Sequence, residues 1–169
     1  MSISRTYLKN NRQQKLHFVT PVAVIRRDDG RILILKRSER EKVYPGCYTF
    51  PGGKVEGHDT ISETLIREVK EECGLILKPG FVLIKEKSIR RPDGYTSKSL
   101  SFLCKAENPD DITLDKTDFS DYAWVNLEEL KKLKHVGIEA EFMKVDKITR
   151  SGTDLTPFFT DTDKVDFKQ

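Results

Sequence analysis

The sequence is poor in cysteine, and its few thiols follow no pairing pattern. Three of its 169 residues are cysteine, an odd number without the spacing of a metal-binding motif. This argues against a dense disulfide framework and predicts free thiols in a reducing compartment, the cytoplasm. Cys73 and Cys104 fall in apolar stretches and are predicted to be core residues. Cys47 follows the Pro45-Gly46 turn and is predicted to be exposed.

The sequence also lacks a strong excess of charge and any long apolar run. Charged residues make up 34% of the chain, but the formal net charge is only +3, which does not indicate a stable nucleic-acid partner. No apolar run approaches the roughly 18 residues that cross a bilayer, so no membrane association is expected. The polar N-terminus, residues 1–14, has no apolar core of the kind found in signal peptides.

The chain length predicts one domain with a substantial core. Stretches rich in β-forming residues predict strands at His17–Arg26, Ile32–Lys36, Tyr48–Phe50, Phe81–Arg90, Tyr95–Ala106 and Tyr122–Val125. Helices are predicted from Thr60 to Gly74, from Leu127 to Leu133 after an Asn126 cap, and from Ile138 to Ile148. Asp28-Asp29-Gly30 is a hairpin turn signal, after which Ile32–Lys36 is expected to return beside His17–Arg26, and Pro92-Asp93-Gly94 is a second turn between two strands. This pattern predicts an α/β or α+β fold with a mixed sheet.

The helix predicted to start at Thr60 has clear signals at both ends. Thr60 and Glu63 form a capping box, in which each side chain accepts from the other residue's N–H. Gly74 suits the left-handed backbone that ends a helix. The apolar residues that recur every four positions predict the buried stripe: Leu65, Val69 and Cys73. The helix is therefore expected to turn its carboxylates toward a cleft.

Three glutamates of this helix are predicted to share one face. Glu68, Glu71 and Glu72 stand at positions i, i+3 and i+4, which a helix brings together. Like charges so close destabilise a helix slightly, unless cations lie among them. Carboxylate oxygens are ligands that suit Mg²⁺ and Mn²⁺. A solvated helix face would show the same glutamates, so the preceding loop decides between the two interpretations.

The segment before this helix, Phe50-Pro51-Gly52-Gly53-Lys54-Val55-Glu56-Gly57, is rich in glycine. Glycines let the backbone approach a ligand closely and leave its N–H groups unhindered. A loop of this kind at the N-terminus of a helix suits phosphate. The loop and the acidic helix together predict a site for a phosphate–metal complex.

The stretch from Gly53 to Leu75 resembles the Nudix box of the Nudix hydrolase family. The positions that match at the family's spacing are Gly53, Arg67, Glu68, Val69, Glu71, Glu72, Gly74 and Leu75. One position departs from the pattern, because Asp59 stands in place of the first glutamate and is one methylene shorter. The flanks also resemble the family, with Pro45-Gly46 and Phe50–Gly53 before the box and the tryptophan segment Trp124–Leu130 after it.

This resemblance implies an α/β/α sandwich built around a mixed β-sheet. The Nudix hydrolase domain is expected to span residues 16–149. An N-terminal segment, residues 1–15, precedes it, and a C-terminal tail, residues 150–169, follows it. The tail is either loose or docked on the domain through Phe158 and Phe159. Dimers are common in the family, so a homodimer is one expected state.

The resemblance also implies hydrolysis of a nucleoside diphosphate linked to another group, with Mg²⁺ or Mn²⁺ as cofactor. The implied metal ligands are Glu68, Glu71, Glu72, the backbone carbonyl of Gly53 and, as a further candidate, Glu56. Arg67 would orient the catalytic carboxylates through ion pairs, and Asp59 would meet it from the loop.

The general base and the substrate contacts stay open at this point. In some members of the family a glutamate at the position of Glu68 takes the proton of the attacking water. In others a carboxylate outside the box does so, and here Asp118 and Asp121 are the candidates. The cations available to contact phosphates are Arg37, Lys36 and Lys54. The aromatic residues available to stack on a base are Tyr44, Tyr48 and Phe50, of which at least one is expected in the core.

Three functions compete on this evidence, each with a small-molecule nucleotide as partner. The first is a nucleotide diphosphohydrolase acting on a free nucleoside or deoxynucleoside triphosphate, or on a modified one, which the compact length favours. The second is hydrolysis of ADP-ribose, a nucleotide sugar or coenzyme A. Leu35 and Lys42, however, stand where the pattern of coenzyme A hydrolases has threonine and arginine. The third is a non-catalytic nucleotide-binding module, against which the retained glutamates argue.

Overall fold

The computed structural model describes residues 17–90 and 94–152. Within these ranges the elements follow in the order β1 (His17–Ile25), β2 (Ile32–Arg37), β3 (Tyr48–Thr49), α1 (Ile61–Cys73), β4 (Val82–Arg90), β5 (Thr96–Cys104), β6 (Phe119–Val125), α2 (Leu127–Leu130) and α3 (Glu139–Arg150). Each predicted strand and helix is confirmed, with ends that shift by a few residues. The predictions for residues 1–16, for Pro92 and Asp93, and for Phe158 and Phe159 lie outside the described residues.

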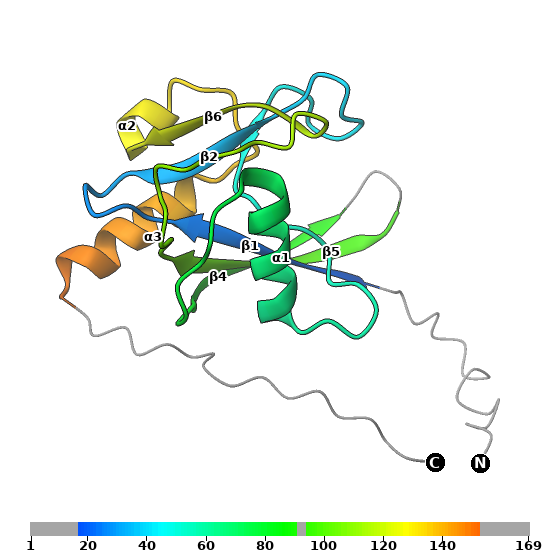
Figure 1. The fold of residues 1–169 in the computed structure, drawn as a ribbon, viewed down its shortest axis with the longest axis horizontal. Helices are drawn as coiled ribbons and strands as arrows, with labels where there is room; N and C mark the ends of the chain where they lie inside the picture. Colours follow the sequence, from blue (N-terminus) through cyan, green and yellow to red (C-terminus); the bar gives the residue numbers. More distant parts are fainter. Residues whose placement is uncertain (1–16, 91–93, 153–169) are drawn as a thin grey trace, which may run out of the picture.

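The strands form two three-stranded sheets (Figure 1). In the first, β5 lies between β1 and β4, parallel to β1 and antiparallel to β4, so the predicted mixed sheet is confirmed. The second is antiparallel, with β2 between β3 and β6. The predicted turn between β1 and β2 also forms, since Gly30 has φ 89° and its N–H donates to the Arg27 carbonyl at 3.0 Å. The predicted hairpin pairing is nevertheless wrong, because beyond one bridge, Arg26 to Ile32, the two strands separate into different sheets.

The two sheets form the middle layer of an α/β/α sandwich, as predicted. α1 lies in front of them in Figure 1 and α3 lies behind. Alternate residues of β2 serve the two faces, because successive side chains of a strand point in opposite directions. Leu33 and Leu35 pack in the cluster that contains the α1 stripe. Ile32 and Ile34 pack in the cluster that contains Phe142 of α3.

The ends of α1 confirm the local signals read from the sequence. The Thr60 side chain accepts from the Glu63 N–H at 3.2 Å, and the Glu63 carboxylate accepts from the Thr60 N–H at 2.8 Å. Gly74 adopts a left-handed backbone with φ 73°, and its N–H donates to the Lys70 carbonyl. The predicted stripe is buried on the inner face of the helix: Leu65, Val69 and Cys73. The helix therefore turns its acidic face away from the core.

Two sequence predictions are wrong in detail. Cys47 is buried, with 6% of its surface exposed. The β2–β3 connection folds back, with the Arg37 N–H donating to the Cys47 carbonyl at 3.0 Å, and this draws the thiol inward. The helix predicted over Leu127–Leu133 ends at Leu130. Its continuation is tighter, since the N–H of Leu133 donates to the carbonyl of Leu130 three residues earlier.

Candidate active site

The glycine loop between β3 and α1 passes directly over two carboxylates of α1. The Gly52 N–H donates to Glu72 Oε2 at 2.8 Å. A Cβ placed on Gly53 would lie 2.3 Å from the carboxyl carbon of Glu68, closer than atoms can approach. Gly52 has φ 144°, and a Cβ there would meet the Pro21 carbonyl oxygen at 2.3 Å. Both glycines are therefore required for the loop to lie against the acidic helix.

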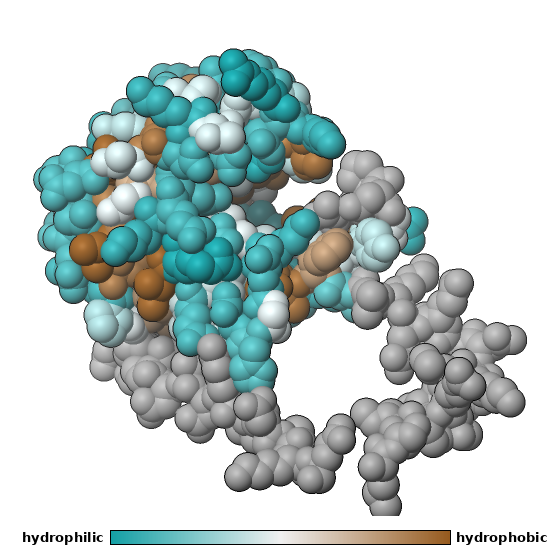
Figure 2. Space-filling view, turned by 45° about the vertical axis from the view of Figure 1, so that its right-hand side comes forward, coloured by the Kyte–Doolittle hydropathy of each residue, from teal (hydrophilic) through white to brown (hydrophobic). Residues whose placement is uncertain are grey.

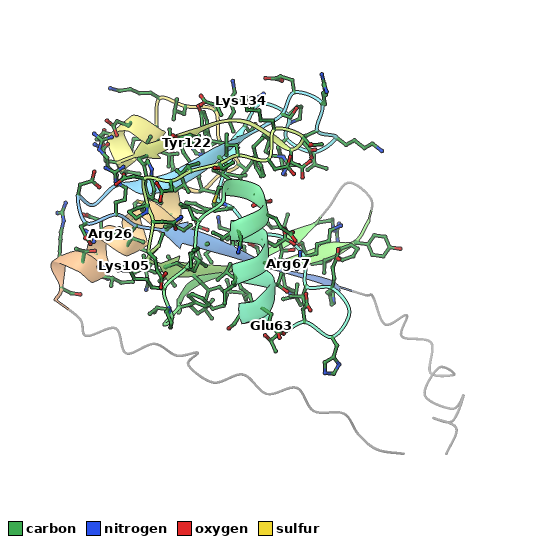
Figure 3. The ribbon with its side chains drawn as sticks, in the orientation of Figure 1. Arg26, Glu63, Arg67, Lys105, Tyr122 and Lys134 are labelled. Carbon is green, nitrogen blue, oxygen red and sulfur yellow. The ribbon has the colours of Figure 1, made fainter. Side chains whose placement is uncertain are left out.

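Arg67 connects the loop to the acidic face of α1. Figure 3 shows it projecting from the side of α1 that faces this loop. Its Nη1 donates to Glu68 Oε1 at 2.8 Å and to Glu71 Oε2 at 3.2 Å. Its Nη2 lies 3.5 Å from Asp59 Oδ2. The aspartate at this position therefore reaches the arginine directly, despite its shorter side chain.

The carboxylates of this region are crowded and poorly compensated by cations. Burial raises the pKa of Glu72 to about 8; the Gly52 N–H and the charge of Arg37 oppose this shift, and the charges of Glu68 and Asp118 add to it. Burial also raises the pKa of Glu68, against the lowering effect of Arg67. Among the described residues Glu72 has no ion pair. A part-buried carboxylate in this environment is stabilised by an added cation.

The other predicted acidic residues lie at different distances from this centre. Glu56 is exposed in the loop, and its charge is close enough to raise the pKa of Glu68. Asp118 is exposed and acts in the same way on Glu72. Asp121 instead accepts from the Tyr48 hydroxyl at 3.3 Å. Glu71 has 61% of its side chain exposed. In the part of the chain that the structure describes, no three acidic, histidine or cysteine residues already stand in ligating positions.

A cavity of about 550 Å³ adjoins the glycine loop. Gly52, Gly53 and Lys54 contribute to its wall, so the segment that covers the carboxylates also borders the cavity. Other parts of the wall come from the β2–β3 connection, β4, β5 and α3. Figure 2, turned to bring the right-hand side of Figure 1 forward, shows the surface hollowed on this side, with apolar residues beside the hollow.

The predicted substrate-binding residues do not all reach this cavity. Arg37 and Lys54 line it; Arg37 donates through Nε to the Val43 carbonyl at 2.8 Å, and the Lys54 ammonium lies 4.6 Å from the centre of the Phe18 ring. Phe50 lines it too, but only 3% of this residue is exposed, and its ring stacks on Phe142 as part of the core. The residues outside the lining are Tyr48 and Lys36, whereas Tyr44 is exposed at its wall.

The buried polar side chains that line this cavity were not identified from the sequence. Glu141 of α3 is 1% exposed, and its Oε1 lies 2.5 Å from Lys87 Nζ of β4. The serines that alternate along β5 also face the cavity: Ser97, Ser99 and Ser101. One signal was available in the sequence. Glu141 stands three residues after Ile138 and four before Val145, so it falls on the apolar stripe of α3.

Comparisons with known proteins agree on one family. The family model described as NUDIX domain matches residues 16–145. The nucleoside triphosphatase NudI of Salmonella agona (strain SL483) is 35% identical over 120 residues, which cover 66% of this chain and 84% of that relative. No helix in the described residues is long and apolar enough to cross a membrane.

Two solved structures share this fold. The MutT protein from Methanosarcina mazei Go1 is 24% identical and superposes with a TM-score of 0.67, covering 83% of this chain and 99% of that one. A C. elegans Ap4A hydrolase in a binary complex is 22% identical with a TM-score of 0.63, covering 80% and 99%. At these identities the similarity shows the fold alone.

Proposed function

The chain belongs to the Nudix hydrolase family and is a nucleotide diphosphohydrolase, and we propose that it cleaves a nucleoside or deoxynucleoside triphosphate with the help of Mg²⁺ or Mn²⁺. The observation that carries this proposal is the position of residues 52–54. They border the α1 carboxylates through Gly52 and Gly53, and they also form part of the cavity wall. One substrate molecule can therefore place its phosphates against the carboxylates and its base in the cavity.

The residues present fit a hard divalent cation. Glu68 and Glu72 supply oxygen donors, Glu71 and Glu56 lie beside them, and the carbonyl of Gly53 is a further donor from the loop. The burial of Glu72 without an ion pair among the described residues supports the same interpretation. A bound divalent cation would offset the negative charge of the phosphates and lower the pKa of the attacking water.

The protein's own residues would orient the reaction and take up its proton. Arg67 fixes Glu68 and Glu71 through its two bonds from Nη1, and Asp59 steadies the guanidinium from the loop. A water molecule attacks phosphorus, the bond from phosphorus to the bridging oxygen breaks, and the water's proton passes to a carboxylate. Glu68 and Asp118 are the two candidates for this base, since both lie beside Glu72.

The test is product release from a substrate panel by the wild type and by Glu72→Gln. The panel holds nucleoside and deoxynucleoside triphosphates, oxidised forms, ADP-ribose, nucleotide sugars, dinucleoside polyphosphates and coenzyme A, each with Mg²⁺, Mn²⁺ or EDTA. We expect turnover of triphosphates, loss of it in EDTA, and a fall of about 100-fold or more in Glu72→Gln.

A matched control separates the site from a general charge effect. Glu107→Gln removes one exposed carboxylate outside the site and should keep wild-type rates. Turnover of another compound of the panel, such as ADP-ribose or coenzyme A, without turnover of triphosphates would overturn the substrate proposal. Normal activity of Glu72→Gln, or turnover that persists in EDTA, would overturn the proposed metal site.

A further inference from the structure

Glu141 is a buried carboxylate that is only half satisfied. Its Oε1 accepts from the Ser101 hydroxyl at 3.1 Å and pairs with Lys87 Nζ at 2.5 Å. Its Oε2 is buried as well, yet it has no hydrogen-bond partner among the described residues. A buried polar atom without a partner costs about 1–3 kcal/mol. Because Glu141 lines the cavity, a ligand that reaches this carboxylate would supply the missing donor.

Lys87 pairs with Oε1 of Glu141 and leaves Oε2 without a partner among the described residues. Its ammonium donates to the Gly137 carbonyl at 3.0 Å and pairs with Glu141, so two of its three N–H groups have partners in the described part of the chain. Lys87 and Glu141 both line the cavity. The cavity wall therefore contains a carboxylate with one unpartnered oxygen and a lysine with a remaining N–H group.

The rest of the cavity suits a flat heterocycle. Val43, Tyr44 and Ile89 line it, and each is between 38% and 55% exposed although it is apolar or aromatic. The inner wall is polar, with Ser97 and Ser99 buried on the same face of β5 as Ser101. Apolar surface with a few convergent polar groups is typical of a site for a small organic ligand. A nucleobase has this combination, with two π faces and an edge of donors and acceptors.

We propose that Glu141 is the residue that selects the base, with its Oε2 accepting a hydrogen bond from an N–H on the base edge and Lys87 donating to the adjacent acceptor. This inference rests on the proposed function, because it assumes that the cavity receives the base of the nucleotide whose phosphates meet α1. It adds a chemical rule for selection: the preferred base presents an N–H at the position of Oε2. A site built to hold such a group discriminates strongly against analogues that lack it.

Glu141→Gln tests this rule with little change in shape. Lys87 and Ser101 both donate to Oε1, so the amide oxygen of glutamine keeps that place and its NH₂ group replaces Oε2. The free acceptor becomes a donor. Lys87 has 24% of its side chain exposed, so it can be hydrated once the ion pair is lost. Folding is checked by thermal unfolding, and the double variant Lys87→Met/Glu141→Gln provides a neutral pair if the single variant is unstable.

The measurement uses nucleotides that differ in one group of the base edge. CTP and UTP differ in an amino or an oxo group, and GTP and ITP in the presence of an amino group. We measure kcat and KM for each with Mg²⁺, and the affinity for the four monophosphates by calorimetry in EDTA. We expect the wild type to discriminate about 10- to 100-fold within at least one pair. In Glu141→Gln this preference should fall to about threefold or less, or reverse, mainly through KM and monophosphate affinity.

The controls distinguish this inference from the proposed function. Glu139→Gln changes a half-exposed glutamate of the same helix that pairs with His135, and it should keep the wild-type preference. Base-selective binding of monophosphates without triphosphate turnover would support the inference and overturn the proposed function. Turnover with the same base preference in wild type and Glu141→Gln, or no preference in the wild type, would overturn the inference alone. Absence of both turnover and binding would overturn both.

Discussion

Glu72 of the candidate active site and Glu141 of the adjoining cavity are stabilised in different ways. Glu141 is almost fully buried and is neutralised by Lys87 from the neighbouring sheet. Glu72 is part-buried, accepts one backbone N–H, and has no ion pair among the described residues. At Glu141 the protein supplies the cation itself. At Glu72 the charges of Glu68 and Asp118 raise the pKa further, and the charge of Arg37 opposes them without forming an ion pair with Glu72.

Because of this difference, the surroundings of Glu72 suit a cation, whereas those of Glu141 suit a hydrogen-bond donor. A carboxylate that already has a lysine gains little from a metal ion, but its free oxygen still accepts a hydrogen bond. A carboxylate surrounded by other carboxylates is stabilised by a divalent cation. Under the two proposals above, side chains of the same type would serve opposite ends of a nucleotide, because their surroundings differ.

Gly53→Ala should cause the largest loss of activity, because it disturbs the carboxylates around Glu72. The new methyl group would lie 2.3 Å from the carboxyl carbon of Glu68, so either the carboxylate or the loop must move. We expect kcat to fall by about 100-fold or more, as is common when positioned groups are displaced. Gly57→Asn is the control, because Gly57 has φ 54° with open space around it, and asparagine tolerates that backbone. Equal losses in both variants would contradict the assigned contact.

Lys87→Met should destabilise the fold by removing the ion pair with Glu141. It leaves a buried carboxylate without its cation, which strongly destabilises proteins. Because Lys87 is partly exposed, we expect a loss of about 2 kcal/mol in the free energy of unfolding, measured in urea. The double variant Lys87→Met/Glu141→Gln should recover most of it. If the double variant is no more stable than Lys87→Met, the ion pair does not govern this stability.

Glu72→Gln should stabilise the metal-free protein while it abolishes turnover. The pKa of Glu72 is about 8 in the folded protein, against an ordinary value of 4.5, so the folded state holds a proton that the unfolded state has released. The stability of the wild type therefore falls as pH rises from about 4.5 to about 8, and glutamine removes this loss.

The measurement is urea unfolding in EDTA at pH 5 and at pH 8. The variant should gain on the order of 1 kcal/mol over the wild type at pH 8 and almost nothing at pH 5. Added Mg²⁺ should stabilise the wild type and not the variant, since ligands stabilise the state that binds them. A pH-independent difference between the two proteins would exclude desolvation of Glu72 as its cause.

The sequence predicts α1 and its loop well because their determinants are local. The capping box at Thr60, the left-handed Gly74 and the spacing of the glutamates all lie within one stretch of chain. The close approach of Gly53 to Glu68 was not predicted, although both residues lie in this stretch. The placement of Arg67 beside Asp59 was expected from the family resemblance, and the structure places the two side chains 3.5 Å apart.

The sequence does not predict features that depend on distant strands. The turn at Gly30 is a local signal, but the departure of β2 into a second sheet depends on its pairing with β3 and β6. The pairing of Glu141 with Lys87 likewise joins α3 to β4. A glutamate on the apolar stripe of α3 indicates a buried charge, but it does not show which cation lies opposite. Cys47 is similar, since its burial depends on how the β2–β3 connection folds back.

Asp59→Glu should have the smallest effect, and it tests how much the ion pair with Arg67 contributes to activity. Asp59 and Arg67 are each 35% exposed and lie 3.5 Å apart, so this ion pair is weak compared with the bonds from Arg67 to Glu68. A longer carboxylate can approach the guanidinium more closely, and we expect kcat/KM to stay within about threefold of the wild type or to rise. Steady-state kinetics on the preferred triphosphate measures this, with Asp59→Asn as the uncharged control. A large loss in Asp59→Glu would mean that the short side chain is specifically required, because the loop then has no room for the extra methylene.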